Sequence, residues 1–276
     1  MRNRKKVWMT IASVGSSLAC VAAQAGTLLA DFNSGAPAGS TLYENAVVGP
    51  SGGVGGTGVL ELTSAQNSQF GFFYLPVLDA GVVSSFSMTF MAYVGGGTCC
   101  ETSSGGTTAD GFSVNFASNL PIPPGFSTAE EGLGTGLSIN FDTWNNELPA
   151  TPEAPAIEVK VGGALISRVF TQVSQGAAVV TPNYWLVSIV LDADGTIDVS
   201  YNGSSIFTNL ATGYVPTVGS RFGFGARTGG ANDNHWIDDL SITTRVGATI
   251  PEPATLALFG LGLAGIGVMR RKKLAA

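Results

Sequence analysis

Residues 185–203 read WLVSIVLDADGTIDVSYNG. Apolar side chains occupy every second position on both sides of Asp194-Gly195, and a period of two is typical of a β-strand with one buried face. Asp-Gly and Asn-Gly pairs favour two-residue hairpin turns, because glycine adopts a positive φ without steric cost. The stretch therefore predicts two antiparallel strands, with one turn at Asp194-Gly195 and another at Asn202-Gly203.

The same alternation recurs in both directions along the chain. It is found at residues 86–90, 112–116, 137–141, 157–161 and 222–226. Gly162-Gly163 predicts a third hairpin turn, and no long helical periodicity, linker or internal repeat interrupts the pattern. About a dozen strands without crossover helices predict an all-β fold, a single antiparallel jelly-roll β-sandwich over residues 26–249.

Composition and charge exclude several classes of protein. Of the 276 residues, 45% are hydrophobic and 12% are charged, which is too apolar for a disordered chain. The 38 glycines argue against a helical bundle. Residues 26–250 hold 5 basic and 18 acidic residues, a formal charge of −13. Such a surface repels phosphate backbones, so we expect no nucleic acid partner, whereas a divalent cation is plausible.

The N-terminus predicts a secretory signal peptide over residues 1–25. A basic patch precedes the mostly apolar stretch 7–21, and Ala23-Gln24-Ala25 forms a small-x-small cleavage site, so we expect cleavage before Gly26. A lipoprotein signal at Cys20 is the alternative, but Ser17 stands where a lipobox has an aliphatic residue. The chain is therefore expected to be exported through the inner membrane.

The C-terminus, residues 250–276, predicts a sorting or anchoring segment. Pro251, Glu252 and Pro253 precede residues 254–269, which carry no charge, and four basic residues follow. A helix of this length spans about 24 Å, enough to enter a membrane at least transiently with snorkelling basic side chains. A simple one-pass anchor is one interpretation. The order of features also resembles the PEP-CTERM sorting signal of exopolysaccharide-producing Gram-negative bacteria, which implies recognition by an exosortase.

Polar residues at the end of one predicted strand suggest a cation site. Asn140 and Asp142 share the strand face opposite the apolar residues, and an Asn-rich loop with Glu147 and Glu153 follows. Calcium binds six to eight oxygens from carboxylates, amides and backbone carbonyls. This stretch offers all three kinds of oxygen. The alternative is a polar sheet face followed by a loop with Asx-turns.

Four motifs resemble the L-type lectins, taken broadly to include the legume lectins and the animal cargo lectins. They are ADGF at 109–112, GLSINFDTWNN at 136–146, PAIEV at 155–159 and TGGA at 228–231, in this order. The resemblance runs through most of residues 27–245. It implies a concanavalin A-like sandwich that binds sugars.

The resemblance also assigns roles to individual residues at a sugar site. Asp110 would follow a cis peptide bond and accept hydrogen bonds from sugar hydroxyls, and Asn146 would also contact the sugar. Gly229 and Gly230 would supply backbone N–H groups from a glycine-rich loop. An aromatic ring would complete such a site, and Trp144, Trp236 and Tyr93 are the candidates, although a core role is open for each.

The calcium ligands that the resemblance implies are Asp142, the backbone carbonyl of Trp144 and the side chain of Asn146. A second carboxylate ligand is not evident from the motif, and Glu153 or Glu147 could serve. The legume lectins carry a Glu and a His for a transition metal, where this chain has Asn140 and Ala156. The second metal site of that family is therefore not expected.

Other candidate residues have structural interpretations. His235 is expected to lie at the surface or to anchor a loop. Asp233, Asp238 and Asp239 are expected to be solvated acids beside a strand, and another cation site is the alternative. The adjacent Cys99 and Cys100 could form a vicinal disulfide, bridge two molecules or stay reduced. The chain lacks the Glu-x-Asp-x-x-Glu motif of related glycoside hydrolases, so no catalytic residue is predicted.

These observations predict an exported, surface-directed carbohydrate-binding protein, assisted by calcium and without catalytic turnover. Its expected partner is a glycan or exopolysaccharide at the cell surface or in the extracellular matrix of a Gram-negative bacterium. The alternatives are a structural matrix or surface protein without a working sugar site, and a glycoside hydrolase.

Overall fold

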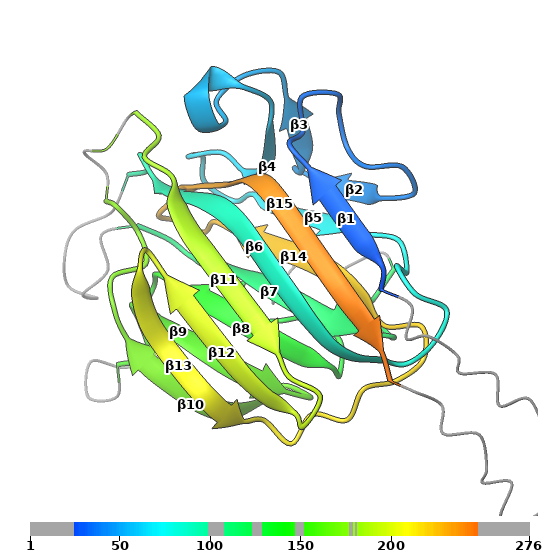
Figure 1. Ribbon diagram of the computed structural model, residues 1–276. Coiled ribbons are helices and arrows are strands. Elements are labelled where there is room, and N and C mark those ends of the chain that lie inside the picture. The colour runs from blue at the N-terminus through cyan, green and yellow to red at the C-terminus, as the bar shows by residue number, and fades with distance from the viewer. Residues whose placement is uncertain are drawn as a thin grey trace, which may run out of the picture. The chain divides into compact units, whose positions relative to one another are not determined.

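The protein folds into two antiparallel β-sheets packed face to face (Figure 1). The computed structural model describes residues 25–98, 108–122, 129–146, 152–176, 179 and 181–247. The predicted signal peptide and sorting segment, Glu147 and the two cysteines Cys99 and Cys100 lie outside these residues. Within them, no helix is long and apolar enough to cross a membrane.

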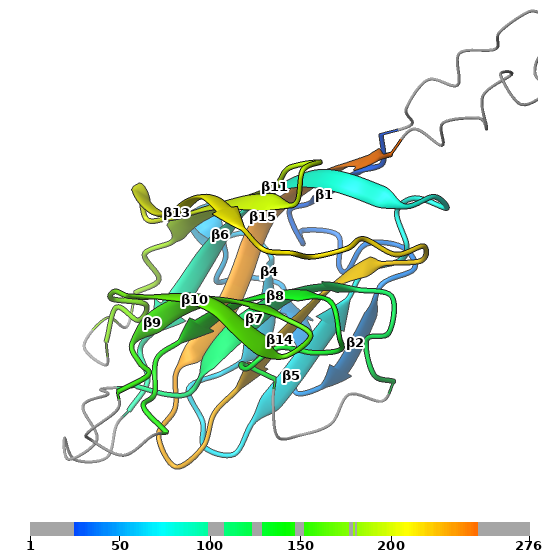
Figure 2. The ribbon, with the colours of Figure 1, turned by 90° about the horizontal axis from the view of Figure 1, so that it is seen from below.

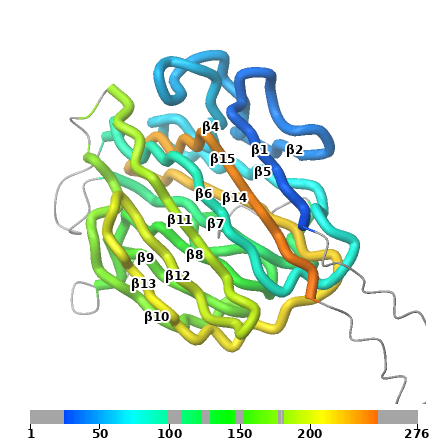
Figure 3. The backbone as a smooth tube through the Cα atoms, viewed as in Figure 1, coloured from blue at the N-terminus to red at the C-terminus, as the bar shows by residue number. Residues whose placement is uncertain are grey.

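The first sheet contains eight strands. They are β1 (Thr27–Ala30), β3 (Val47–Gly49), β4 (Val59–Thr63), β6 (Val83–Gly95), β11 (Trp185–Leu191), β12 (Thr196–Tyr201), β13 (Ser204–Ala211) and β15 (Asn234–Val246). Their order is β13-β12-β11-β6-β15-β4-β3, and β1 also pairs with β15. The first and last described strands thus lie side by side, as the tube in Figure 3 shows.

The second sheet contains seven strands. They are β2 (Thr41–Glu44), β5 (Phe70–Tyr74), β7 (Gly111–Ala117), β8 (Leu137–Asp142), β9 (Ala156–Val161), β10 (Ala164–Phe170) and β14 (Arg221–Arg227). Their order is β10-β9-β8-β7-β14-β5-β2. A single 3-10 turn, η1 (Val54–Gly56), lies between β3 and β4. The end-on view in Figure 2 separates the two layers. The predicted all-β antiparallel sandwich is confirmed.

All seven predicted strand segments are strands in the structure, but the turns differ in detail. Asn202-Gly203 and Gly162-Gly163 have φ values of 49° and 76°, and 60° and 81°, as two-residue turns require. Asp194-Gly195 instead belongs to a longer loop, which is closed by hydrogen bonds from Asp192 N to Thr196 O and from Gly195 N to Asp192 O. The two-residue turn predicted there is wrong, because β11 already ends at Leu191.

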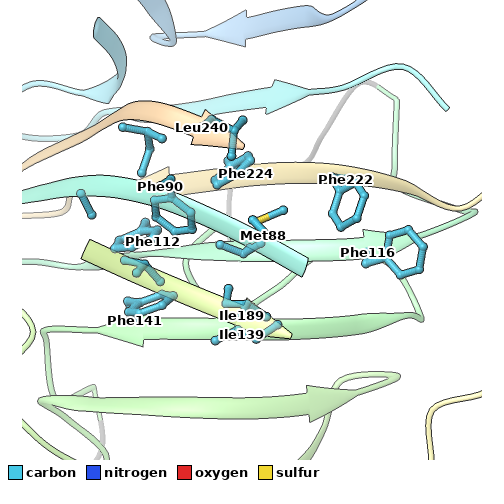
Figure 4. Close-up of a cluster of buried hydrophobic side chains, with 14 of the residues drawn as sticks. Met88, Phe90, Phe112, Phe116, Ile139, Phe141, Ile189, Phe222, Phe224 and Leu240 are labelled. Carbon is cyan, nitrogen blue, oxygen red and sulfur yellow. The ribbon is translucent and has the colours of Figure 1, made fainter. Parts of the chain in front are cut away.

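The hydrophobic core lies between the two sheets and is rich in phenylalanine (Figure 4). Phe112 of β7 stacks on Phe141 of β8, with ring centroids 4.4 Å apart. Phe90 of β6 meets Phe224 of β14 edge-on across the layers, with ring centroids 5.5 Å apart. Each buried aromatic side chain stabilises the fold by about 1.5–3 kcal/mol. The alternation seen in the sequence therefore places one face of each strand in this core.

The outer face of the second sheet is also covered, by residues 129–134. Ala129 and Leu133 pack there in a second apolar cluster with side chains of β5 and β7. An added Cβ at Gly132 would stand 2.5 Å from Ser138 Oγ, so this segment approaches β8 closely. As a result Asn140 and Asp142 are buried, although they do lie on the face opposite the core as predicted. This burial sets the electrostatics of the candidate site.

Candidate functional site

Asp110 and Asp142 meet at one edge of the second sheet, because β7 begins where the neighbouring antiparallel strand β8 ends. Gly111 and Asp142 are direct partners across the two strands. Beyond them, Thr143 N donates a hydrogen bond to Asp110 O at 3.0 Å. Two carboxylates that are far apart along the chain are thus held by one ladder of backbone hydrogen bonds.

The Asp110 carboxylate is buried beside the glycine-rich loop 228–231. A cis peptide bond joins Ala109 to Asp110, as the lectin resemblance implies. An added Cβ at Gly229 would stand only 3.2 Å from Asp110 Oδ2, so glycine keeps this approach open. Gly229 N donates to Ala231 O at 3.0 Å and is not available to a ligand in this conformation. Gly230 faces open space.

Arg227 and Glu130 complete the surroundings of Asp110, and the sequence analysis missed both. Arg227 Nε lies 3.1 Å from Asp110 Oδ2, and Arg227 Nη2 lies 2.6 Å from Glu130 Oε1. Both carboxylates are buried. Glu130 follows an uncharged stretch and has no motif of its own, so only the covering segment 129–134 brings it to Arg227.

Burial dominates the titration of these two carboxyl groups. It raises the pKa of Asp110 to about 6 and the pKa of Glu130 to about 7, while the nearby Arg227 cation opposes both increases. Glu131 raises both pKa values further through like-charge repulsion. One guanidinium therefore compensates two buried acids only in part.

The loop after β8 folds back on itself next to Asp142. Trp144 N donates to Asp142 Oδ1 at 3.0 Å, and Asn146 Nδ2 donates to Trp144 O at 3.4 Å. Glu153 reaches the same loop, since its Oε1 accepts a hydrogen bond from Asn146 N at 2.7 Å. Its own backbone N donates to Asn145 Oδ1 at 3.1 Å. The structure thus brings together the four residues predicted as calcium ligands.

The charge at Asp142 is poorly compensated. Burial raises its pKa to about 8, repulsion from Glu131, Glu153 and Glu158 adds to the increase, and the hydrogen bond from Trp144 N lowers it. Thr143 Oγ1 is buried nearby without a hydrogen-bond partner among the described residues.

An oxygen-rich set around an uncompensated carboxylate fits a hard cation such as Ca²⁺. No three Asp, Glu, His or Cys side chains of the described residues gather to hold a metal. A cation here would therefore depend on the Trp144 carbonyl and the Asn146 amide as well as on carboxylates.

The remaining candidates serve the scaffold. His235 is fully buried, and its Nδ1 lies 2.6 Å from Thr63 Oγ1, so of the two positions expected for it the one at the surface is wrong. Asp233 and Asp238 are buried rather than solvated. Each accepts a hydrogen bond from the backbone N–H of a loop residue, which replaces water as its partner. Tyr93 and Trp236 contact each other on the outer face of the first sheet. Of the three aromatic candidates, only Trp144 lies in the loop beside Asp142.

Several solved lectin structures have a similar arrangement of strands. The exoplasmic/lumenal domain of VIP36 in its Ca²⁺-bound form matches with a TM-score of 0.60 and 17% identity, over 82% of this chain and 92% of that one. The chain has an L-type lectin-like fold. At this identity the likeness shows the fold alone, and the concanavalin A-like fold also includes glycosidases.

Two further lectins share this fold. The carbohydrate recognition domain of Emp47p matches with a TM-score of 0.55 and 17% identity, covering 80% of this chain and 95% of that one. Basic winged bean lectin with Tn-antigen matches with a TM-score of 0.54 and 17% identity, covering 81% of this chain and 100% of that one. A comparison with curated protein sequences gave no match.

The C-terminus matches a family model of its own. Residues 249–273 match the PEP-CTERM protein-sorting motif, which confirms the interpretation of Pro251-Glu252-Pro253 and the apolar stretch behind it. The motif implies export and sorting to the cell surface by an exosortase. The lectin-like fold is therefore attached to a surface-sorting signal.

Proposed function

We propose that this protein is exported to the cell surface and binds a glycan there, with calcium assistance and without catalysis. The observation that carries the proposal is the junction of β7 and β8, where Asp110 lies beside Gly229 and the loop 142–146. The partner in this proposal is a glycan of the surrounding exopolysaccharide, and the exosortase acts on Pro251, Glu252 and Pro253. Residues 254–269 hold the chain in the inner membrane until that step.

The chemistry of the junction suits paired sugar hydroxyls. An ionised Asp110 accepts hydrogen bonds from two hydroxyls, while the Asn146 amide and the backbone at Gly230 offer further polar groups. Arg227 forms an ion pair with the Asp110 carboxylate, so the orientation of this carboxylate does not depend on a bound sugar. Trp144, half-buried in the loop, is the aromatic group nearest in the chain to this set.

Calcium would be held by Asp142, the Trp144 carbonyl, Asn146 and Glu153. A bound ion supplies positive charge that fixes the loop and compensates the buried carboxylate. The residues themselves orient the loop, because Glu153 holds the backbone of Asn146 and Asp142 holds that of Trp144. Loss of this loop order would release Asn146 from its contacts with Glu153 and Trp144.

The test is a glycan array probed with residues 26–249, which contain the compact β-sandwich unit. The array is run with calcium and with chelator, for the unmodified body, for Asp110→Ala and for Asp239→Asn. Asp239 is exposed and lies outside the site, so its variant is the matched control.

We expect at least one glycan on the array whose signal requires calcium and is lost with Asp110→Ala but not with Asp239→Asn. No binding to any glycan would favour a structural matrix protein. Release of sugar products from polysaccharides would show a hydrolase instead.

A further inference from the structure

A hollow lies on the outer face of the first sheet, whereas Asp110 lies at an edge of the second sheet. It has a volume of about 480 Å³ and is lined by residues 52–56, by Met91 and by residues 181–184. Met91 points outward from β6, since its neighbours Phe90 and Ala92 are buried in the core. None of these lining residues carries a formal charge. The hollow therefore suits an uncharged ligand.

Two side chains, Asp238 and Tyr184, hold the wall formed by residues 52–56. The buried Asp238 accepts hydrogen bonds from Val54 N at 2.7 Å and from Thr57 Oγ1 at 3.3 Å. Tyr184 OH donates to Gly52 O at 2.8 Å from the opposite side of the hollow. Asp238 thus holds residues 54–57 in place and is not a solvated acid. The wall is positioned before any ligand arrives.

Glycine is required in this wall by close contacts and by backbone conformation. An added Cβ at Gly53 would stand 2.5 Å from Asp238 Oδ2, and one at Gly52 would stand 3.1 Å from the Trp236 ring. Gly55 has a φ of 70° and faces open space. Apart from Val54, the wall therefore has no side chain that covers the hollow. The backbone N–H groups of Gly53, Val54 and Gly56 already donate hydrogen bonds within the protein, so Gly55 at the open rim is the part of the wall that can meet a ligand.

An aromatic side chain forms the opposite wall. The ring of Tyr184 lies 6.1 Å from that of Tyr93, and Tyr93 in turn contacts Trp236 at 5.5 Å. These three rings form a continuous row of aromatic contacts, which meets the glycine wall where Trp236 lies against Gly52. This row keeps the Tyr184 ring in place as a contact surface.

The lining combines apolar surface with uncharged hydrogen-bonding groups. Tyr184 and Met91 supply the apolar surface, and Asn183 and Thr181 supply the polar groups. A sugar ring has the matching character, with an apolar face and hydroxyls at its edge. An acidic ligand would be repelled by the charge of −13 on residues 26–250. The volume falls in the range of sites for small ligands.

The geometry points to a second saccharide site at this hollow, which binds a neutral glycan without calcium and without Asp110. Because the two sites lie on different sheets, one molecule would hold two glycan segments at once. Two linked contacts strengthen binding to a polymer far beyond either contact alone. The protein would then cross-link a polysaccharide matrix as well as bind it.

Affinity electrophoresis tests this site separately from the first. Residues 26–249 carrying Asp110→Ala are run with chelator through native gels that contain a neutral glucan, mannan or galactan, or the acidic polymer alginate. We expect retardation in at least one neutral gel and none in alginate. Normal mobility in all three neutral gels, or retardation by alginate, would overturn the proposal.

Substitutions in the hollow then locate the binding. Gly55→Asn places a side chain at the open rim, and Asn tolerates a positive φ. Its control is Gly213→Asn, since Gly213 has a φ of 68° and also faces open space. Gly55→Asn in the Asp110→Ala background should weaken retardation at least tenfold, whereas Gly213→Asn should not. Equal effects of the two would refute the site.

Tyr184 provides a second pair of variants in case Gly55→Asn disturbs folding. Tyr184→Leu removes the aromatic face and Tyr184→Phe retains it, while both lose the hydrogen bond to Gly52. Stronger retardation for Tyr184→Phe than for Tyr184→Leu is expected, and equal retardation would contradict the proposal. Gly55→Asn alone should keep its calcium-dependent signal on the glycan array, so failure of one site is distinguishable from failure of the other.

Discussion

Arg227 Nε lies 3.1 Å from Asp110 Oδ2, and the same guanidinium reaches Glu130 through Nη2 at 2.6 Å. A single cation therefore faces two buried carboxylates. Arg227 is the last residue of β14, and Asp110 immediately precedes β7. Asp110 N donates a hydrogen bond to Arg227 O at 2.9 Å. The backbone pairing of these two strands thus places the cation behind the proposed sugar-binding carboxylate.

The first prediction concerns Arg227→Gln. Without the cation, the pKa of Asp110 should rise further above its present value of about 6. One additional unit would lower the ionised fraction of Asp110 at pH 6 from about one half to about one eleventh, and glycan binding would fall by about fivefold, because the protonated acid loses acceptor capacity. A pH titration of binding should show the midpoint displaced upward. Arg227→Lys keeps the charge and should show a smaller displacement; identical midpoints for Gln and Lys would argue against this role.

The second prediction concerns stability and pH. Burial raises the pKa of Glu130 from 4.5 to about 7, so the folded state holds its proton more tightly than the unfolded state. The stabilising contribution is complete below about pH 4.5 and is lost as the pH rises through 7. In chelator, the body should melt at a lower temperature at pH 8 than at pH 5. Glu130→Gln should reduce this difference, and calorimetry that finds it unchanged would exclude Glu130 as its source.

The third prediction concerns Glu153, whose Oε1 accepts from Asn146 N at 2.7 Å. Glu153→Gln removes a negative charge from the loop that carries Asp142. Calcium affinity should fall at least about tenfold, because Glu153 is a proposed ligand and also holds the Asn146 backbone. Isothermal titration of Ca²⁺ into the body measures this change. Asp239→Asn removes an equal charge elsewhere and should leave the affinity intact.

The fourth prediction concerns the core. Phe112 stacks on Phe141 at 4.4 Å and is fully buried. Phe112→Ala should lower the free energy of unfolding by about 3–5 kcal/mol, through lost apolar burial and the cavity left behind. Urea denaturation followed by fluorescence measures the change. The exposed Phe170 offers a comparison, since Phe170→Ala should cost far less.

The fifth prediction concerns sorting. Replacing Pro251, Glu252 and Pro253 with alanine removes the tripeptide of the sorting motif within residues 249–273. In cells that contain an exosortase, the variant should accumulate in the membrane fraction, because the uncharged segment 254–269 remains attached. Immunoblots of membrane and medium fractions distinguish the two forms. Pro216→Ala should be sorted normally, and release of the triple variant into the medium would show that the tripeptide is dispensable.

Strand positions with strong alternation were predictable from the sequence, whereas weakly patterned strands were not. Residues 112–116 and 137–141 alternate clearly, because one face of each enters the core. The edge strand β10 is largely exposed, so no buried face marks it in the sequence. The strand β15 contains a register shift between Asp238 and Ser241, which interrupts its alternation. A strand can therefore be predicted from its sequence pattern when one of its faces is buried in the core.

Local composition and periodicity are enough to establish that the chain is all-β, that its body is acidic and that a sorting motif follows it. The contacts of Arg227 and Glu130 at Asp110, of Asp238 with the glycine wall and of Glu153 with Asn146 became visible only in the folded chain. These contacts join residues from different strands and loops. Their distances depend on sheet order and strand register, which no local pattern encodes.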